Sequence, residues 1–142
     1  MDKSIKSLKV VFCNYYPMTV RDVELSKVKG IFVVLYSEED DPNCVVPQNV
    51  VVLKVTTSRP YSSMYVKVDD NTEVISVSES DAFTFRRESY ILGNHILTLP
   101  IANCVVLGEL NTKDSAKVIS MVSDLFGKVI NQTCAGIINR SI

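Results

Sequence analysis

The sequence has little of the residue types that small catalytic and metal sites need. It contains one histidine, His95, and no tryptophan in 142 residues. Its four cysteines, Cys13, Cys44, Cys104 and Cys134, lie far apart, and no two have the CxxC spacing. Because a structural zinc site normally takes closely spaced Cys and His ligands, we expect no metal and no cofactor. Reduced, mostly buried thiols in a cytoplasmic or nuclear protein are the expected state of these cysteines.

An excess of charge of either sign is also missing. Fifteen Lys and Arg residues stand against sixteen Asp and Glu residues, which gives a net charge of −1. Electrostatic capture of nucleic acid or of an anionic membrane is therefore not expected. No apolar run approaches the roughly eighteen residues of a membrane span. The apolar run 8–13 contains Lys9 and is too short for a signal peptide, so we interpret it as a first strand.

The motifs of the common enzyme classes are absent as well. The sequence holds no phosphate-binding loop, no dinucleotide fingerprint and no nucleophile elbow. Enzymes without such motifs exist, so this absence lowers the expectation of catalysis without removing it. We expect no catalytic residue, and we leave open whether the chain is an enzyme.

What the sequence does contain is the composition of one globular domain. Apolar residues make up 46% and charged residues 22% of the chain, close to the ordinary globular average. A chain of this length can bury its own hydrophobic core. We therefore expect a single domain over 1–142, with an acidic mobile loop at 37–49 and a C-terminal tail at 131–142.

Short β-branched and aromatic runs dominate the chain up to residue 110, and such runs are typical of strands. The run GIFVVLY at 30–36 is apolar on both faces, which predicts a central strand covered on both sides. Phe83 and Phe85 are expected to share one face of a further strand. Strands are also predicted at 8–13, 20–25, 49–57, 63–68, 72–78 and 104–110, with 63–68 and 72–78 paired as a hairpin.

The periodicity changes after residue 111. Apolar residues between 118 and 130 recur at helical spacing, and Thr112 or Asp114 is expected to cap the helix start. We expect this helix to cover a sheet face, with close packing at Gly127, rather than to be presented to a partner. Gly136 is expected to end it. The predicted fold is α+β: a mostly antiparallel meander of about eight strands, open or folded into a sandwich, with one long C-terminal helix packed on a sheet face.

The stretch RRESYILGNHILTLP at 86–100 gathers the widest variety of reactive side chains. Its simplest interpretation is a β-hairpin that turns at Gly93-Asn94. Glycine accepts the positive φ that a type II′ turn requires at its first position. His95 would then lie just after the turn, as a structural residue.

The alternative interpretation makes the same stretch the pocket of a small enzyme. His95 would act there with Arg86, Arg87 or Tyr90, and it would need a nucleophile and an orienting acid within hydrogen-bond reach. No motif supplies that arrangement. We favour the hairpin, and we expect one of the two arginines to pair with Glu88 or with an opposite strand.

The segment 37–49, SEEDDPNCVVPQN, carries four consecutive acids. Consecutive carboxylates do not match the alternating ligands and central glycine of a calcium loop. The segment is either a solvated surface loop, which we favour, or a partner-docking element. Combined with the cationic stretch, it gives these candidate partner-binding residues: Glu38, Glu39, Asp40, Asp41, Arg86, Arg87 and His95.

The C-terminal part of the chain consists of the strand CVVLGEL, the connection NTKDSAK and the helix VISMVSDLFGKVI, after a run of strands with no leading helix. This layout resembles the small β-rich proteasome assembly chaperones of types three and four. The resemblance lies in layout and not in a motif, so it carries over no functional residue. It implies a non-catalytic cytoplasmic protein that heterodimerises with a similar subunit and binds α-type proteasome subunits.

Other families share parts of this layout. Profilins and longin-type trafficking domains also end on a strand and a helix, but profilins begin with a helix and longins contain more helix than this chain. A lipid- or peptide-binding β-sandwich of the pleckstrin type, closed by a C-terminal helix, fits the order of elements. The sequence lacks the basic cluster that phosphoinositide binding requires. We therefore expect a protein-interaction domain first, with a small enzyme and a lipid- or peptide-binding adaptor as alternatives.

Overall fold

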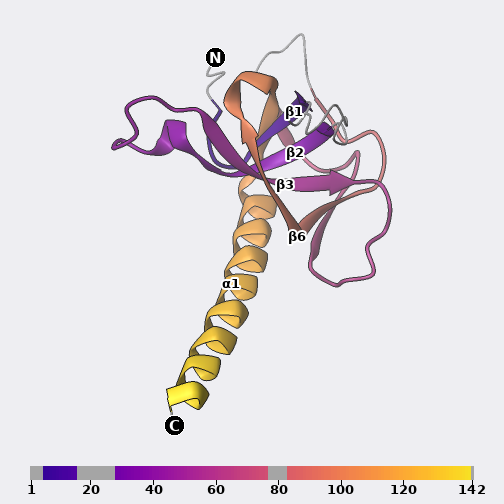
Figure 1. The fold of residues 1–142 in the computed structure, drawn as a ribbon. Helices are drawn as coiled ribbons and strands as arrows, with labels where there is room; N and C mark the ends of the chain where they lie inside the picture. The colour runs from indigo at the N-terminus through magenta and orange to yellow at the C-terminus, as the bar shows by residue number, and fades with distance from the viewer. Residues whose placement is uncertain (1–4, 16–27, 77–82, 142) are drawn as a thin grey trace, which may run out of the picture.

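The computed structural model describes residues 5–15, 28–76 and 83–141, with side chains in the helix described as far as Lys128 (Figure 1). Seven strands form one antiparallel sheet in the order β4-β6-β3-β2-β1-β7-β5. The sheet is curled, and one C-terminal helix packs on it, which confirms the predicted α+β fold. The strands and helices are β1 Lys9–Tyr15, β2 Val28–Ser37, η1 Glu38–Asp40, β3 Asn49–Thr56, β4 Tyr65–Val68, β5 Val74–Ser76, β6 Ser89–Pro100, η2 Ile101–Asn103, β7 Cys104–Leu110 and α1 Thr112–Ser141.

The first three strands form a meander, and the later strands extend it on both sides. β6 pairs with β3, and β7 pairs with β1. The predicted strand at 20–25 lies outside the described residues, and residues 83–88 belong to no strand. Phe83 and Phe85 nevertheless share one side of their segment, as predicted, because both pack into the same core and their rings meet edge to face at 5.1 Å.

The predicted hairpin between 63–68 and 72–78 is wrong, although its turn exists. The Asp69 N–H donates to the Thr72 hydroxyl and the Asn71 N–H donates to the Asp69 carboxylate, both at 2.9 Å. β4 then pairs with β6, while β5 pairs with β7 at the opposite edge of the sheet. The turn therefore joins the two edges of the curled sheet instead of two neighbouring strands.

Apolar side chains are buried on both faces of the sheet, because successive residues of a strand point to opposite faces. β2 shows this directly: Phe32, Val33 and Val34 are 2%, 0% and 0% exposed, which confirms the predicted two-sided cover of this strand. The core on the helix side contains Val10, Val33, Leu53, Val66, Val68, Phe85, Ile91, Leu110, Val118 and Val122. The core on the other face contains Ile5, Val11, Cys13, Phe32, Val34, Val50, Val52, Leu99 and Val106.

Helix α1 begins at a cap that the sequence interpretation placed one to three residues too late. The Asn111 side-chain oxygen accepts a hydrogen bond from the Asp114 N–H at 2.8 Å, which is the geometry of an N-cap residue. The same side chain donates to the Asp114 carboxylate at 2.6 Å and to the Glu73 carbonyl at 2.7 Å. Asn111 therefore starts the helix and ties it to the residue before β5.

The first half of α1 packs on β4 and β6, through Val118, Met121 and Val122. The helix then runs through Gly127 and Gly136 to Ser141, so the glycine expected to end it does not. Its far half extends away from the sheet (Figure 1). A Cβ added at Gly127 would meet nothing within 4 Å, so the close packing predicted at that glycine is wrong.

The close approach of helix and sheet is instead at Gly93, where the hairpin prediction is also wrong. β6 runs unbroken from Ser89 to Pro100, and its pairing with β3 shifts between Leu53↔Ile96 and Val55↔Ile91. Residues 92–95 therefore form a bulge in one long strand. A Cβ at Gly93 would lie 2.9 Å from the Met121 Sδ, so the glycine makes room for the helix.

Replacing Gly93 with alanine is expected to lower the free energy of unfolding by about 1 kcal/mol, because the new Cβ must displace the Met121 thioether. Urea unfolding measures this loss. In a Met121→Ala background the same replacement should cost less than half as much, since the obstructing sulfur is gone. An equal cost in both backgrounds would show that the helix does not constrain this position.

Candidate functional site

A cleft opens where the two central strands of the described sheet separate. β2 and β3 pair from Ser37↔Val50 to Phe32↔Lys54. Beyond that point residues 28–31 pair with β1 and residues 55–56 pair with β6, and no pairing in the described sheet joins the two segments. Gly30 has φ +152°, a conformation that other residues rarely adopt, and it lies where β2 departs from its partner. We call this opening the β2–β3 cleft.

The β2–β3 cleft has a volume of about 980 Å³ and an apolar, aromatic floor. β1, β2 and β3 supply Phe12, Ile31 and Val55. Phe12 pairs with Ile31 in the sheet register, and both Ile31 and Val55 pack against the helix-side core. The segment 83–89 forms the other wall, through Phe83 and Phe85. Hydroxyl groups stand among these apolar side chains, from Thr56, Thr57, Thr84 and Ser89.

Three cations complete the lining: Lys29, Arg86 and Arg87. None of the described residues that line the cleft is acidic. Both arginines are exposed, and neither guanidinium forms an ion pair with a described carboxylate. The cleft is therefore a positively charged rim around an apolar floor, and two of the predicted partner-binding residues belong to it.

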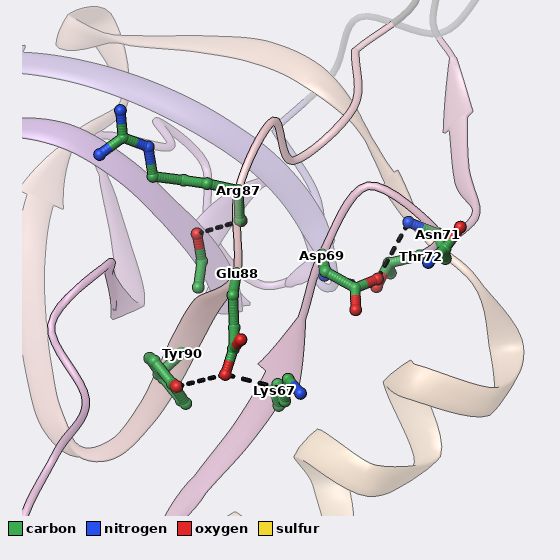
Figure 2. Close-up of polar contacts among 8 residues, drawn as sticks. Lys67, Asp69, Asn71, Thr72, Arg87, Glu88 and Tyr90 are labelled. Atoms are coloured by element: carbon green, nitrogen blue, oxygen red, sulfur yellow. Dashed lines mark hydrogen bonds and ion pairs between the residues drawn. The ribbon is translucent and has the colours of Figure 1, made fainter.

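Glu88 does not pair with either arginine, so the Glu88 alternative of that prediction is wrong. Figure 2 shows the Arg87 side chain extending away from Glu88, as expected for successive residues of an extended segment. Glu88 instead accepts a hydrogen bond from the Tyr90 hydroxyl at 2.5 Å and forms an ion pair with Lys67 at 3.5 Å. Since the Tyr90 hydroxyl proton is held by this carboxylate, Tyr90 is not poised as an acid or base for the cleft.

The Tyr90–Glu88 bond shifts the pKa of both groups. The Tyr90 hydroxyl, and to a smaller degree Lys67, lowers the pKa of Glu88 from its ordinary value of 4.5. The same carboxylate, together with partial burial, raises the pKa of Tyr90 from 10.0. The two groups thus hold each other in the charged and neutral forms at neutral pH.

Replacing Glu88 with glutamine is expected to reduce the acid sensitivity of the fold. A carboxylate whose pKa is lowered by folding stabilises the protein above its unfolded pKa, and this contribution is lost as the pH falls through the folded value. The urea midpoint of the variant should therefore fall less between about pH 7 and about pH 3 than that of the parent. Tyr90→Phe removes the hydroxyl that contributes most to the lowered pKa of Glu88. The urea midpoint of this variant should therefore also fall less than that of the parent over the same pH range. An unchanged difference in both variants would contradict this assignment.

The four acids of the segment 37–49 accept hydrogen bonds from other residues of the same chain. Ser37 begins η1: its hydroxyl accepts from the Glu39 N–H and donates to the Ile5 carbonyl at 2.5 Å. The Glu39 carboxylate accepts from the Ile5 N–H at 2.7 Å, and the Asp40 carboxylate accepts from the Ser7 N–H at 2.9 Å. These two acids therefore hold residues 5–7 against the end of β2.

The remaining two acids hold the loop. Asp41 accepts hydrogen bonds from the Tyr36 hydroxyl at 3.3 Å and from the Asn43 N–H at 2.9 Å. Glu38 accepts from the Cys44 thiol at 3.3 Å, and this contact is the main reason why the pKa of Glu38 is lowered. The mobility and the partner-binding role of this segment stay predictions, and the hydrogen bonds give the acids a structural role.

His95 lies exposed in the β6 bulge and does not line the β2–β3 cleft. The structure thus brings Arg86 and Arg87 together but leaves His95 apart from them. Among the described residues, no group of three or more His, Cys, Asp and Glu could hold a metal ion.

Two cysteines are direct neighbours across β1 and β7. Cys13 pairs with Cys104 in the sheet register, and both are free thiols. Burial raises the pKa of both, to about 12 for Cys104. Because the thiolate is the reactive form of cysteine, neither thiol is activated as a nucleophile at neutral pH.

The sequence interpretation missed the floor of the cleft and Lys29. The floor residues come from three different strands, and the sequence pattern predicts each strand by itself without showing where the three meet. The only local signal was a glycine at the start of the most apolar run, Gly30.

Comparison with known proteins adds no assignment, because no family model and no curated protein matches this chain by sequence. In the part of the chain that the structure describes, α1 is too polar to cross a membrane.

Proposed function

We propose that this chain is a non-catalytic intracellular protein-interaction domain whose partner binds in the β2–β3 cleft. The cleft supports this proposal because it combines a large apolar floor with three cations and with no described acidic lining residue. Apolar and aromatic surface supplies most of the binding free energy of an interface, and arginine is enriched at interfaces relative to the rest of the surface. The four acids at 38–41 form hydrogen bonds within the fold.

Within this proposal, the partner is inferred from the layout of the last strand and helix, which resembles that of the small β-rich proteasome assembly chaperones. The domain acts in the cytoplasm as an assembly chaperone: it heterodimerises with a similar small subunit and binds α-type proteasome subunits. The cationic rim suits a partner segment that carries carboxylates, because arginine binds a carboxylate with two parallel hydrogen bonds.

Purification from the native cell, followed by multi-angle light scattering and identification of the companions, tests the proposal. The expected result is a stoichiometric complex with one similar small protein or with proteasome α subunits. A monomer without a companion would overturn it.

The double variant Arg86→Glu/Arg87→Glu is expected to lose most of the companion, by about tenfold, because the cleft rim then repels carboxylates. The matched control is Lys113→Glu/Lys128→Glu, which makes the same charge change at two exposed positions of α1. The control should retain the companion. Equal retention by both double variants would show that the partner binds elsewhere.

A further inference from the structure

We infer that the ligand of the β2–β3 cleft is an extended acidic peptide, which adds as a strand to the cleft-facing edge of β3 at Val55 and Thr56. This inference rests on the proposed function, because it names the ligand class of the same cleft. It adds the mode of binding, through backbone hydrogen bonds, and the pattern of side chains that the peptide must carry.

The backbone supplies the first argument. An exposed edge of a sheet presents unpaired N–H and C=O groups, and these are a template for a further strand. β3 is paired with β6 on one side at Val55 and Thr56, but on its other side no described residue pairs with it there, because the β2–β3 pairing ends at Phe32↔Lys54. Such an edge normally lies at the rim of a sheet, whereas this one lies in the middle and opens into the cleft.

Gly30 keeps the opposite side of the opening clear. It lines the cleft, and a Cβ built on it would meet nothing within 4 Å. The absence of a side chain on a strand residue often marks a place where another backbone approaches closely. The positive φ of Gly30 and the open space over it therefore both indicate that this segment of β2 leaves room for a chain between itself and β3.

The side chains supply the second argument, which concerns specificity. Successive side chains of an added strand alternate between the two faces, so every second one points at the floor formed by Phe12, Ile31 and Val55. The residues between them point away from this floor, and Arg86 and Arg87 are exposed cations that line the same cleft. The matching peptide alternates apolar residues with aspartate or glutamate.

A short fluorescent peptide that alternates glutamate with leucine and phenylalanine is the probe, and anisotropy with the full chain is the measurement. The inference predicts saturable binding that weakens about tenfold in the Arg86→Glu/Arg87→Glu variant and changes less than about twofold in the Lys113→Glu/Lys128→Glu control. The same peptide with lysine in place of glutamate should not bind.

Two further probes separate the mode of binding from simple charge attraction. N-methylation of alternate backbone amides, on the edge that would face β3, should weaken binding about tenfold, because it removes the donors of the added strand. Oleate, an apolar chain with one carboxylate, tests the competing lipid ligand. Equal binding of the N-methylated peptide, or displacement of the peptide by oleate with tighter binding of oleate, would overturn the inference.

The proposed function and this inference fail in different ways. In one outcome, the Arg86→Glu/Arg87→Glu variant loses a native companion but the parent does not bind the acidic peptide. This outcome would support the proposed interaction domain and contradict strand addition. A monomer without a companion that also ignores the peptide would remove both. Thermal unfolding of each double variant confirms that a loss of binding is not a loss of folding, since all four replaced residues are exposed.

Discussion

Replacing Leu53 with alanine is expected to lower the free energy of unfolding by about 3 kcal/mol. Leu53 is fully buried in the middle of β3, where it belongs to the core that α1 covers, and it ranks among the largest fully buried side chains. The loss combines the transfer of the removed methyl groups with the cavity that a central strand cannot close. A domain of this size has a total stability of about 5 to 15 kcal/mol, so the change is large.

Urea unfolding at two probes, far-ultraviolet circular dichroism and tyrosine fluorescence, measures this effect as a shift of the midpoint at constant slope. Lys54→Ala is the matched control, because the next residue of the same strand is exposed and should change stability by less than about 0.5 kcal/mol. A midpoint shift no larger than that of the control would mean that the central strand does not pack as described.

Replacing Gly30 with alanine is expected to cost about 2 kcal/mol for a different reason. At φ +152° an alanine is strained whatever space surrounds it, and the space here is open, since a Cβ would meet nothing within 4 Å. The cost is therefore conformational, and Gly30→Ser should be destabilising by nearly the same amount. The mutation removes no contact, so the loss cannot be restored by trimming a neighbour.

Gly127→Ala is the matched control for Gly30→Ala. A Cβ at Gly127 also meets nothing within 4 Å, but this glycine lies in α1, where alanine is the better helix former. The same substitution should therefore stabilise the protein by about 0.5 to 1 kcal/mol at Gly127 and destabilise it at Gly30. Changes of the same sign at both positions would contradict the backbone conformation of Gly30.

The elements themselves were predictable from the sequence where the pattern is long or strongly apolar. The two-sided strand at 30–36, the strand at 104–110 and the helical stripe from 118 onward were all found, because burial imposes its period directly on the residues. The partners of the strands were not predictable. A turn signal at 69–71 says that the chain reverses, but not that β4 and β5 diverge to opposite edges.

Gly93 is a single residue whose structural role was likewise not predictable from its local sequence. A glycine followed by asparagine between two apolar runs is the signal of a hairpin, but here the same residues bulge within one strand, where Gly93 leaves room for Met121 of α1. The reason for the glycine is 28 positions away in the sequence. For the cleft, likewise, the two arginines were visible as neighbours, while the floor depends on where three strands meet.

The strand order also has a consequence for the chain while it is being made. β1, β2 and β3 are complete at residue 56, but the strands that cover their outer edges, β6 and β7, end only at residues 100 and 110. At ordinary rates of synthesis, roughly 5 to 20 residues per second, several seconds pass between the synthesis of β3 and that of β7. During this time the outer edges of β1 and β3 are not yet paired. We expect the nascent chain to associate with ribosome-bound chaperones in this interval, and co-expression of such chaperones should raise the yield of native protein without changing its stability.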